Sequence, residues 1–518
     1  MAGGGLYALV AYGTQNVILS GNPQMTYFYK AFKRYSHFAM ESITIALEGP
    51  NDPSYDSTVD LRAKIPRYGD LMSELIFSFH IPDIYSKYLP PTGSRTSQYE
   101  FQWVRYIGAA IINRVGIYIG GQRIQEIDGS YLLARALLDQ DQDSFQKWRL
   151  LVGDTDAIIS PSTSEYASYD ARTQIYSGYP TVVTNAAAPA GAQLNRPSIF
   201  GRDIHVPLSF WFSESPSKAL PLIGLQYHEC EVQITLNPIN QLYTILDSYG
   251  MRVSPGFAST PANATQNAPV YNASNDNTVS IKNFLTDINY ATPALDTWQT
   301  FYPRLQATFI YLPREEQIIF ATRPLSYILT QVTNFSFHDQ TTRSVLDLQA
   351  HNPLTRMIFV QRRSDSYKRN DFANFTNWFT YPYYPFSPTP SPPPGIPFSS
   401  GVLLPAMQQE MIRSIHVLCD GNEIQETKNA DYFTTYSTYK YARGIGQTGL
   451  PIYSFQLQDS PTQPSGSLNA SRIRNFQIDL DFWPLPVGIP YKYDVDIYVE
   501  NLNFLEIVSG MGGLKYAL

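Results

Sequence analysis

Three glycines near residue 445 have the spacing of a dinucleotide-binding loop. Gly444, Gly446 and Gly449 form a GxGxxG pattern. Such a loop binds a pyrophosphate only where it leads from a strand into a helix whose N-terminus faces the phosphates. Here the segment that follows, 450–455, favours a strand, and no acidic residue lies at 465–470 to bind a ribose. We interpret the pattern as a flexible turn and expect no cofactor.

Other residue types that carry chemistry do not form a recognisable site. The SxxK spacing occurs at Ser215–Lys218 and Ser437–Lys440, but the SDN and KTG elements that accompany a serine nucleophile are missing. His205 and His228 flank one apolar region, and Glu229 and Glu231 are near the second of them. Neither histidine has the ligand spacing of a zinc site. The sequence therefore predicts no catalytic, metal or cofactor residues and a protein that is not an enzyme.

Three further features have ordinary structural explanations. Cys230 and Cys419 are too few and too far apart for a disulfide framework, which favours a reducing environment. A basic cluster, Arg362, Arg363, Lys368 and Arg369, is interpreted as a solvated turn. Asn-x-Ser/Thr sequons are common in so Asn-rich a chain, and the sequence leaves their glycosylation open. They begin at Asn263, Asn272, Asn334, Asn374 and Asn469.

The composition fits a large globular β protein that does not bind nucleic acid. The 518 residues are enough for two to four domains, and 43% of them are hydrophobic. Only 16% are charged and the net charge is −7, which argues against a protein that neutralises phosphate groups. Aromatic residues reach 14%, which suits strands and large semi-polar interfaces.

Strand patterns dominate the chain. Apolar residues alternate with polar ones, which predicts antiparallel sheets with one buried face. The clearest runs are 75–81, 115–119, 206–212, 232–236, 476–482 and 493–500. In the last two runs Asp and Glu occupy the outward face, where we expect them to discourage edge pairing. A single helix, capped by Ser130, is predicted over 130–151, with Leu133, Leu137, Phe145 and Trp148 on one stripe.

The chain also contains an internal repeat and two loop-like stretches. Residues 117–126, IYIGGQRIQE, match 417–426, VLCDGNEIQE, at an offset of 300, which indicates two similar domains in tandem. Strand-rich halves of this size suggest two β-sandwiches. Residues 154–197 and the proline-rich 382–405 are interpreted as long surface loops, the latter exposed and sensitive to protease.

The N-terminal stretch 2–29 contains no charged residue. It includes Gly3, Gly4, Gly5, Gln15 and Asn16, so it is too polar for a membrane span, and it lacks the basic start of a secretion signal. We interpret it as a packed or interfacial N-terminal arm.

Several segments, taken together, resemble the major capsid proteins of nucleocytoplasmic large DNA viruses, the irido-, phycodna- and mimivirus-like group. The similarity runs from end to end, except in the two loops. The matching segments are GGLYALVAYG (4–13), GNPQMTYF (21–28), PLSFWF (207–212), LPLIGLQYHE (220–229) and SGMGGL (509–514).

The resemblance implies an all-β fold of two tandem eight-stranded jelly rolls with short helical excursions and long surface loops. We expect an arm at 1–25, a first jelly roll at 26–245, a linker and loop region at 246–299 and a second jelly roll at 300–518. The implied function is a structural capsid protein, found in the virion and assembled in the cytoplasm of the infected cell. It would form trimeric, pseudo-hexameric capsomers that tile an icosahedral shell.

The implied partners are two further copies of the chain, neighbouring capsomers, and minor capsid and penton proteins. An internal membrane could face the arm. Two alternatives stay open: a minor capsid, penton or spike paralogue with the same fold, and a glycan-binding jelly-roll module. A metal-dependent enzyme on the same sandwich is the weakest alternative, because no ligand motif is present.

Overall fold

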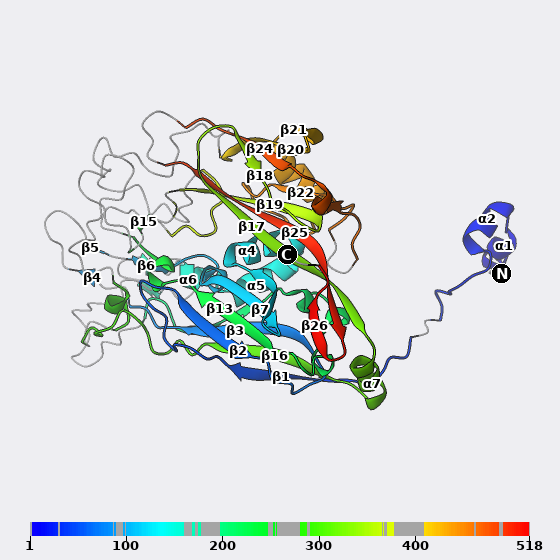
Figure 1. The fold of residues 1–518 in the computed structure, drawn as a ribbon, viewed down its shortest axis with the longest axis horizontal. Helices are drawn as coiled ribbons and strands as arrows, with labels where there is room; N and C mark the ends of the chain where they lie inside the picture. Colours follow the sequence, from blue (N-terminus) through cyan, green and yellow to red (C-terminus); the bar gives the residue numbers. More distant parts are fainter. Residues whose placement is uncertain are drawn as a thin grey trace.

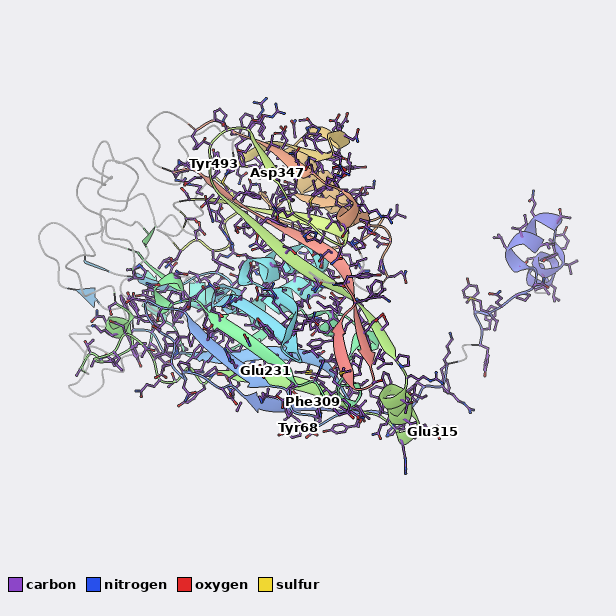
Figure 2. All side chains as sticks on the ribbon, in the orientation of Figure 1. Tyr68, Glu231, Phe309, Glu315, Asp347 and Tyr493 are labelled. Atoms are coloured by element: carbon purple, nitrogen blue, oxygen red, sulfur yellow. The ribbon has the colours of Figure 1, made fainter. Side chains whose placement is uncertain are left out.

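Two β-sandwiches are stacked on each other, and an N-terminal arm extends away from them (Figure 1). A computed structural model describes residues 3–29, 32–85, 101–159, 197–246, 280–286, 291–364, 370–377, 409–459, 463–485 and 491–516, with a few short pieces between them. Side chains fill the interior of both sandwiches, while the arm stands clear (Figure 2).

The first sandwich contains two sheets of antiparallel strands. One sheet has the order β1-β16-β3-β11, and the other has the order β2-β13-β7-β8. In the first sheet these strands are β1 (Ala39–Ala46), β16 (Arg304–Tyr311), β3 (Leu71–Ile81) and β11 (Arg202–Pro207), with β12 (Leu220–Pro221) also paired to β3. In the second they are β2 (Val59–Lys64), β13 (Cys230–Leu236), β7 (Ile112–Ile119) and β8 (Gln122–Ile127).

The second sandwich repeats this arrangement. Its sheets have the orders β17-β25-β19-β22 and β18-β24-β20-β21. The first sheet contains β17 (Leu325–Gln340), β25 (Tyr493–Val508), β19 (Pro353–Arg363) and β22 (Ile452–Ser454), with β23 (Leu468–Asn469) and β26 (Met511–Leu514) at its margins. The second contains β18 (Ser344–Asp347), β24 (Phe476–Phe482), β20 (Ile412–Cys419) and β21 (Asn422–Asn429). Numbering eight main strands along each half gives the same sheets, 1-8-3-6 and 2-7-4-5, which is the jelly-roll order.

The predicted alternation and the predicted repeat are both confirmed. Leu75, Phe77 and Phe79 are at most 1% exposed and point into the first sandwich. The two matching segments are the β7–β8 and β20–β21 hairpins, which occupy the same place in each sandwich. Each turns through two residues with positive φ, including Gly121 and Gly421, as a tight type I′ hairpin requires.

The expected division of the chain at residue 300 does not match the strand pairing. β16 pairs with β1 and with β3, so residues 304–311 complete the first sandwich rather than begin the second. Part of the expected linker also lies in the first core, because Ile281, Phe284 and Trp298 are buried there. The last strand of a jelly roll pairs with its first and third strands. It therefore belongs to the same sandwich even where a long insertion separates it in sequence from the strand before it.

The run 206–212 is a strand only in its first part. β11 ends at Pro207, and Trp211–Ser213 form a 3₁₀ turn. Phe210, Trp211 and Phe212 are nevertheless fully buried. Burial on both sides of the turn produces the apolar pattern without an extended backbone.

The acidic residues of the C-terminal strands do not protect sheet edges. β24 lies between β18 and β20, and β25 lies between β17 and β19. Asp479 of β24 is 4% exposed and accepts from the Nε and Nη2 atoms of Arg343. That hydrogen-bonded guanidinium lowers the pKa of Asp479 below its usual value. These carboxylates therefore stabilise the sheets internally, because they pair with side chains or N–H groups of adjacent strands.

Asp479→Asn should make the fold less sensitive to acid. Because the folded pKa of Asp479 is depressed, its stabilising contribution is present above about pH 4 and is lost as the pH falls through the folded pKa. The variant should be less stable than the wild type at pH 7, and the difference should shrink toward pH 3. Urea midpoints measured from pH 3 to pH 7 test this, with Asp481→Asn on the same strand as control. A difference that stays constant over this range would contradict the prediction.

The predicted helix over 130–151 is two helices. α4 (Gly129–Asp139) and α5 (Gln142–Leu151) are separated at Gln140, whose backbone is extended. The N-cap is Asp128 rather than Ser130, because the Asp128 side chain accepts from the backbone N–H of Tyr131 at 2.7 Å. Asp141 is a second residue suited to an N-cap, and α5 begins after it.

The N-terminal arm contains two short helices that contact no core. In α1 (Gly4–Val10) and α2 (Thr14–Ser20) no residue is buried, and Leu19 is 91% exposed. Among the residues described here, no helix is long and apolar enough to cross a membrane. The arm is thus not packed within its own chain, and its apolar side chains are available to another component.

The remaining predicted loops fall largely beyond the placed residues. Residues 382–405 lie outside the described part of the chain, as does most of 154–197. The short helices α3 (Ile107–Ala110), α6 (Asp156–Ile159) and α7 (Arg314–Thr322) connect strands of the sandwiches. A small sheet of β6 (Glu100–Trp103), β14 (Tyr243–Leu246) and β15 (Arg252–Val253) lies at one end of the first sandwich (Figure 1).

Candidate functional site: the junction between the two sandwiches

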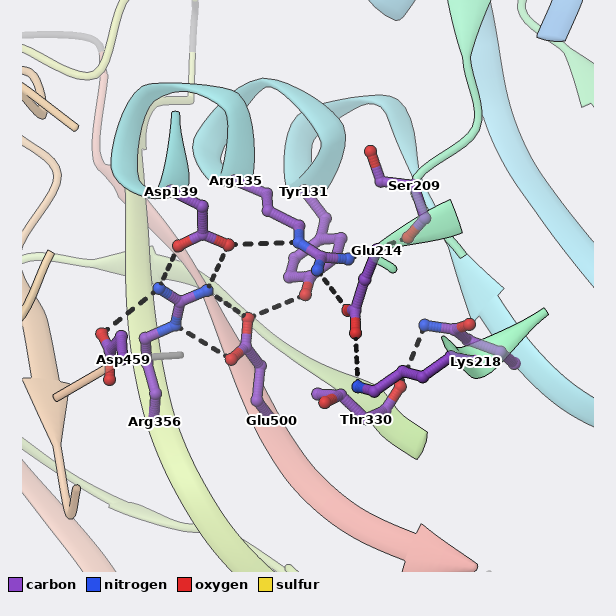
Figure 3. Close-up of polar contacts among 11 residues, drawn as sticks. Tyr131, Arg135, Asp139, Ser209, Glu214, Lys218, Thr330, Arg356, Asp459 and Glu500 are labelled. Carbon is purple, nitrogen blue, oxygen red and sulfur yellow. Dashed lines mark hydrogen bonds and ion pairs between the residues drawn. The ribbon is translucent and has the colours of Figure 1, made fainter. Parts of the chain in front are cut away.

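Helix α4 lies between the two sandwiches (Figure 1), and it carries polar side chains toward the second (Figure 3). Tyr131, Arg135 and Asp139 are four residues apart, so they share one face of the helix. The opposite face is apolar, with Leu133 and Leu137 in the first core. This pattern places three hydrogen-bonding groups against β19 and β25.

Arg356 of β19 is the centre of a buried ion-pair network (Figure 3). It is 3% exposed. Its Nη1 and Nη2 atoms donate to Asp139 at 2.6 and 3.1 Å, and its Nε and Nη2 atoms donate to Glu500 at 2.9 and 2.8 Å. Asp459 accepts from Nη1 at 3.3 Å. The planar guanidinium thus binds two carboxylates in a forked geometry, one from each sandwich.

The network continues along α4 into the first sandwich. Arg135 donates to Asp139 at 3.1 Å and also binds Glu214, which in turn accepts from Lys218 at 2.7 Å. The Tyr131 hydroxyl donates to Glu500 at 2.7 Å. Charge-assisted hydrogen bonds therefore connect Lys218 of the first sandwich, through α4, to Arg356 and Glu500 of the second.

Burial and charge act in opposite directions on the carboxylates of this network. Burial opposes ionisation of Asp139, but Arg356 and Arg135 lower the pKa of Asp139 below its usual value. For Asp459, burial is the larger effect and raises the pKa, although Arg356 counteracts it. Four carboxylates thus share two guanidinium groups and one ammonium, and the carboxylate with the raised pKa is the weakest contact of Arg356.

The network also lines a cavity of about 290 Å³ between the sandwiches. Its walls include Arg135, Asp139, Arg356 and Glu500. Such charged side chains suit solvent rather than an apolar ligand. In the described part of the chain, no group of three or more His, Cys, Asp or Glu side chains is placed to bind a metal.

The GxGxxG segment is a turn, as predicted, but hydrogen bonds to α4 make it a second contact of the junction, so it is not the flexible turn that was expected. The N–H groups of Gly444 and Gly446 donate to the carbonyl oxygens of Leu138 and Leu137 at 2.6 and 3.0 Å. They thereby satisfy carbonyl groups at the C-terminus of α4. A Cβ on Gly444 would lie 2.1 Å from the Leu137 oxygen, so only glycine permits this approach.

A third contact joins two of the segments that carry the sequence resemblance. The C-terminal hairpin of β25 and β26 reaches back to residues 225–229 of the first sandwich. Tyr227 donates its N–H to the Gly510 carbonyl at 3.0 Å, and His228 Nδ1 lies 2.9 Å from the Gly512 carbonyl. A Cβ on Gly510 would be 2.7 Å from the Tyr227 ring. Gly510 therefore allows the hairpin to pack closely against the first sandwich.

The histidines and lysines considered from sequence are not brought together. His205 Nδ1 lies 2.7 Å from Ser78 Oγ, far from the contacts of His228 with the C-terminal hairpin. Lys218 belongs to the ion-pair network, whereas Lys440 lies over the Tyr441 ring at 4.8 Å. Cys230 and Cys419 are buried free thiols.

The basic cluster is not a solvated turn where the structure describes it. Arg363 is 3% exposed and stacks on Tyr491, with 3.5 Å between the guanidinium carbon and the ring centroid. Arg362 binds Ser130 of α4 at 3.0 Å and lies over Phe372. Both arginines lie at the end of the buried strand β19, where their guanidinium groups lose hydration. The contacts with aromatic rings compensate for that loss. Lys368 and Arg369 lie outside the described residues.

The sequons differ in accessibility. Asn374 is 6% exposed and its amide is bound to Thr376 and Asp371, so it is not open to modification in the folded chain. Asn334 and Asn469 are exposed. Asn263 and Asn272 lie outside the described residues.

The sequence interpretation missed Asp139, Arg356, Asp459 and Glu500. A usable signal existed for two of them. Arg356 interrupts the apolar run 354–360, and Glu500 directly follows Val499 at the end of an alternating run. Charged residues inside such runs are seldom buried unless they are paired.

Comparisons with known proteins match both halves of the chain. A family model described as major capsid protein N-terminus matches residues 26–281. A second, described as large eukaryotic DNA virus major capsid protein, matches residues 316–513. The major capsid protein of Paramecium bursaria Chlorella virus 1 is 27% identical and that of Chrysochromulina ericina virus is 26% identical, each over 99% of this chain and at least 99% of its own length.

The fold agrees with solved capsid protein structures. PBCV-1 VP54 superposes with a TM-score of 0.65 and 20% identity, covering 95% of this chain and 100% of its own. The Faustovirus major capsid protein gives a TM-score of 0.62 and 15% identity, covering 97% and 96%. These similarities establish the double jelly-roll fold. With the two family models, which together span most of the sequence, they show that the chain belongs to the family of major capsid proteins of large eukaryotic DNA viruses.

Proposed function

We propose that the chain is the structural building block of an icosahedral virus shell, and that three copies form one capsomer with a pseudo-hexagonal outline. One observation carries the proposal. Two sandwiches of identical strand order occur in one chain and are fixed to each other by a buried network. Three such chains would present six similar units around a closed ring, which suits hexagonal tiling.

The chemistry of the junction fits this assembly role. Its charged side chains bind one another across the boundary between the two sandwiches. The junction instead sets the angle between the two sandwiches, and a fixed angle is what a closed ring requires. In this proposal the protein resides in the virion shell and contacts neighbouring capsomers, minor capsid and penton proteins.

The solution mass of the purified protein tests the proposal. Light scattering should give about three times the chain mass of 58.5 kDa, and negative-stain images should show hexagonal particles. A monomer at micromolar concentration would contradict the capsomer. Abundance in purified virions then separates a major capsid protein from a minor paralogue.

Deleting residues 1–24 should leave trimers intact and weaken shell assembly. The arm exposes Leu6, Leu9 and Ile18, each more than 70% accessible, and none of them packs against a hydrophobic core of the described residues. We propose that they bind the inner layer of the particle, either minor capsid proteins or an internal membrane. Particle yield and capsomer mass are measured together.

A matched control keeps the arm but replaces Leu6, Leu9 and Ile18 with serine. It should reproduce the loss of assembly if apolar contact is the cause. Normal particle yield from both variants would argue against a role for the arm.

A further inference from the structure

The two repeated hairpins have the same geometry but different burial. In each, an irregular step in the strand register follows the residue at position 117 or 417. Ile124 is fully buried and Gln125 is 2% exposed. Their counterpart Ile424 is 42% exposed, and Gln425 is partly exposed. The same local structure is thus covered in the first sandwich and open in the second.

The first hairpin is covered by the edge strand of the second sandwich. Gln125 Nε2 donates to the Thr330 carbonyl of β17 at 2.9 Å, and Gln331 Nε2 donates to the Ile124 carbonyl at 2.8 Å. Gln425 Nε2 instead donates to the carbonyl of its own neighbour, Glu426, at 3.1 Å. Among the described residues, no strand covers the second hairpin as β17 covers the first.

The helices after the hairpins repeat the same difference. α4 presents Tyr131, Arg135 and Asp139 to the second sandwich. The helical segment 430–441, which includes η10 (Tyr432–Tyr436) and α8 (Ser437–Tyr441), has Tyr432, Tyr436 and Lys440 at an offset of 301. Tyr436 is 45% exposed, Tyr439 beside it is 87% exposed, and Lys440 is exposed. We name this surface, with Ile424 and Gln425, the helix face.

The outer surface of the sheet β1-β16-β3 corresponds to the surface that α4 covers. A register irregularity at Thr355 in β19 matches one at Ser73 in β3. When the two sheets are aligned at these irregularities, Glu74 of β3 is equivalent to Arg356 of β19. Its partner Thr308 on β16 is equivalent to Glu500 on β25. Met40 of β1 takes the place of Thr330.

This corresponding surface is exposed, and it carries a carboxylate, that of Glu74, where the second sandwich carries the guanidinium of Arg356. Glu74 is exposed and accepts from the Thr308 hydroxyl at 3.3 Å. Ser42 and Thr44 of the edge strand β1 are also exposed. Within the chain, an aspartate on the helix meets an arginine on the sheet. Between chains, a lysine on the helix would meet a glutamate on the sheet.

We propose that the helix face of one copy docks on the outer surface of β1, β16 and β3 of a second copy, with Lys440 facing Glu74 and Gln425 donating to the Met40 carbonyl. This contact repeats between chains the geometry that α4 makes within one chain. The two surfaces lie at opposite ends of the stacked sandwiches, so the contact is head-to-tail, and three copies close the ring. The proposal rests on the proposed capsomer and assigns its interface.

Charge reversal tests the assignment. Lys440→Glu and Glu74→Lys should each lower the trimer fraction at least tenfold at micromolar concentration, because like charges then oppose across the contact. The double variant should restore trimers. Lys64→Glu, an exposed lysine on the opposite sheet of the first sandwich, is the matched control and should assemble normally. Light scattering measures the mass, and circular dichroism confirms that each variant is folded.

A crosslink gives an independent readout. The two native cysteines are buried, so Gln425→Cys with Met40→Cys provides two accessible thiols. A short bis-maleimide should link chains into dimers and trimers on a denaturing gel, and each single variant should stay monomeric there. If the wild type is a trimer but charge reversal has no effect and no crosslink forms, this interface is wrong, although the proposed capsomer is not contradicted. A monomeric wild type would overturn the capsomer itself.

Discussion

Arg356→Ala is expected to destabilise the protein by about 3–5 kcal/mol, the usual cost of removing one partner from a buried ion pair. Three carboxylates bind this guanidinium: Asp139, Asp459 and Glu500. Without it the largely buried Asp459 and Glu500 and the partly buried Asp139 repel one another. The loss should appear as a melting temperature about 10 °C lower, since about 1 kcal/mol corresponds to about 2–4 °C in a domain of this size.

Calorimetry measures this effect and should also show the two sandwiches melting in separate steps. Arg413→Ala is the matched control, because Arg413 is 55% exposed and lies 3.5 Å from Asp481. It should cost less than about 1 kcal/mol. Arg356→Lys keeps the charge but not the forked geometry, so its melting temperature should lie between those of Arg356→Ala and Arg413→Ala. Equal melting temperatures for Arg356→Ala and Arg413→Ala would show that the network does not hold the junction.

Gly444→Ala should destabilise the junction by about 1–3 kcal/mol, the range seen when atoms are forced into a well-packed interior. The new Cβ would lie 2.1 Å from the Leu137 oxygen and 2.8 Å from the Leu138 carbonyl carbon. These are backbone atoms of α4 and cannot rotate away. The segment must therefore withdraw, and its two hydrogen bonds to the helix carbonyls are lost.

Limited proteolysis and thermal unfolding measure this loosening together. Gly513→Ala is the matched control, because its nearest neighbour is the Gln122 side-chain oxygen at 3.4 Å and its φ is not positive. The control should digest at the wild-type rate, whereas Gly444→Ala should be cleaved several times faster between the sandwiches. Wild-type protease resistance of Gly444→Ala would mean that the segment tolerates a side chain and does not fix the junction.

Local patterns in the sequence predicted the strands and the duplication, because both depend on residues close together in the chain. The alternation 75–81 specifies which side chains point inward, whatever the strand pairs with. The hairpins around Gly121 and Gly421 are specified by the turn residues themselves. Helix α4 was predicted for the same reason, although the break at Gln140 was missed because the apolar stripe continues through α5.

The junction and the division of the chain were decided only by the tertiary structure. Asp139 and Arg356 are 217 residues apart, and Arg356 and Glu500 are 144 residues apart. No local period relates such residues, so their meeting depends on how two finished sandwiches pack. The same holds for β16, whose pattern specifies a strand but not which sheet it joins. A sequence pattern determines the face of an element, whereas its partner is determined by packing.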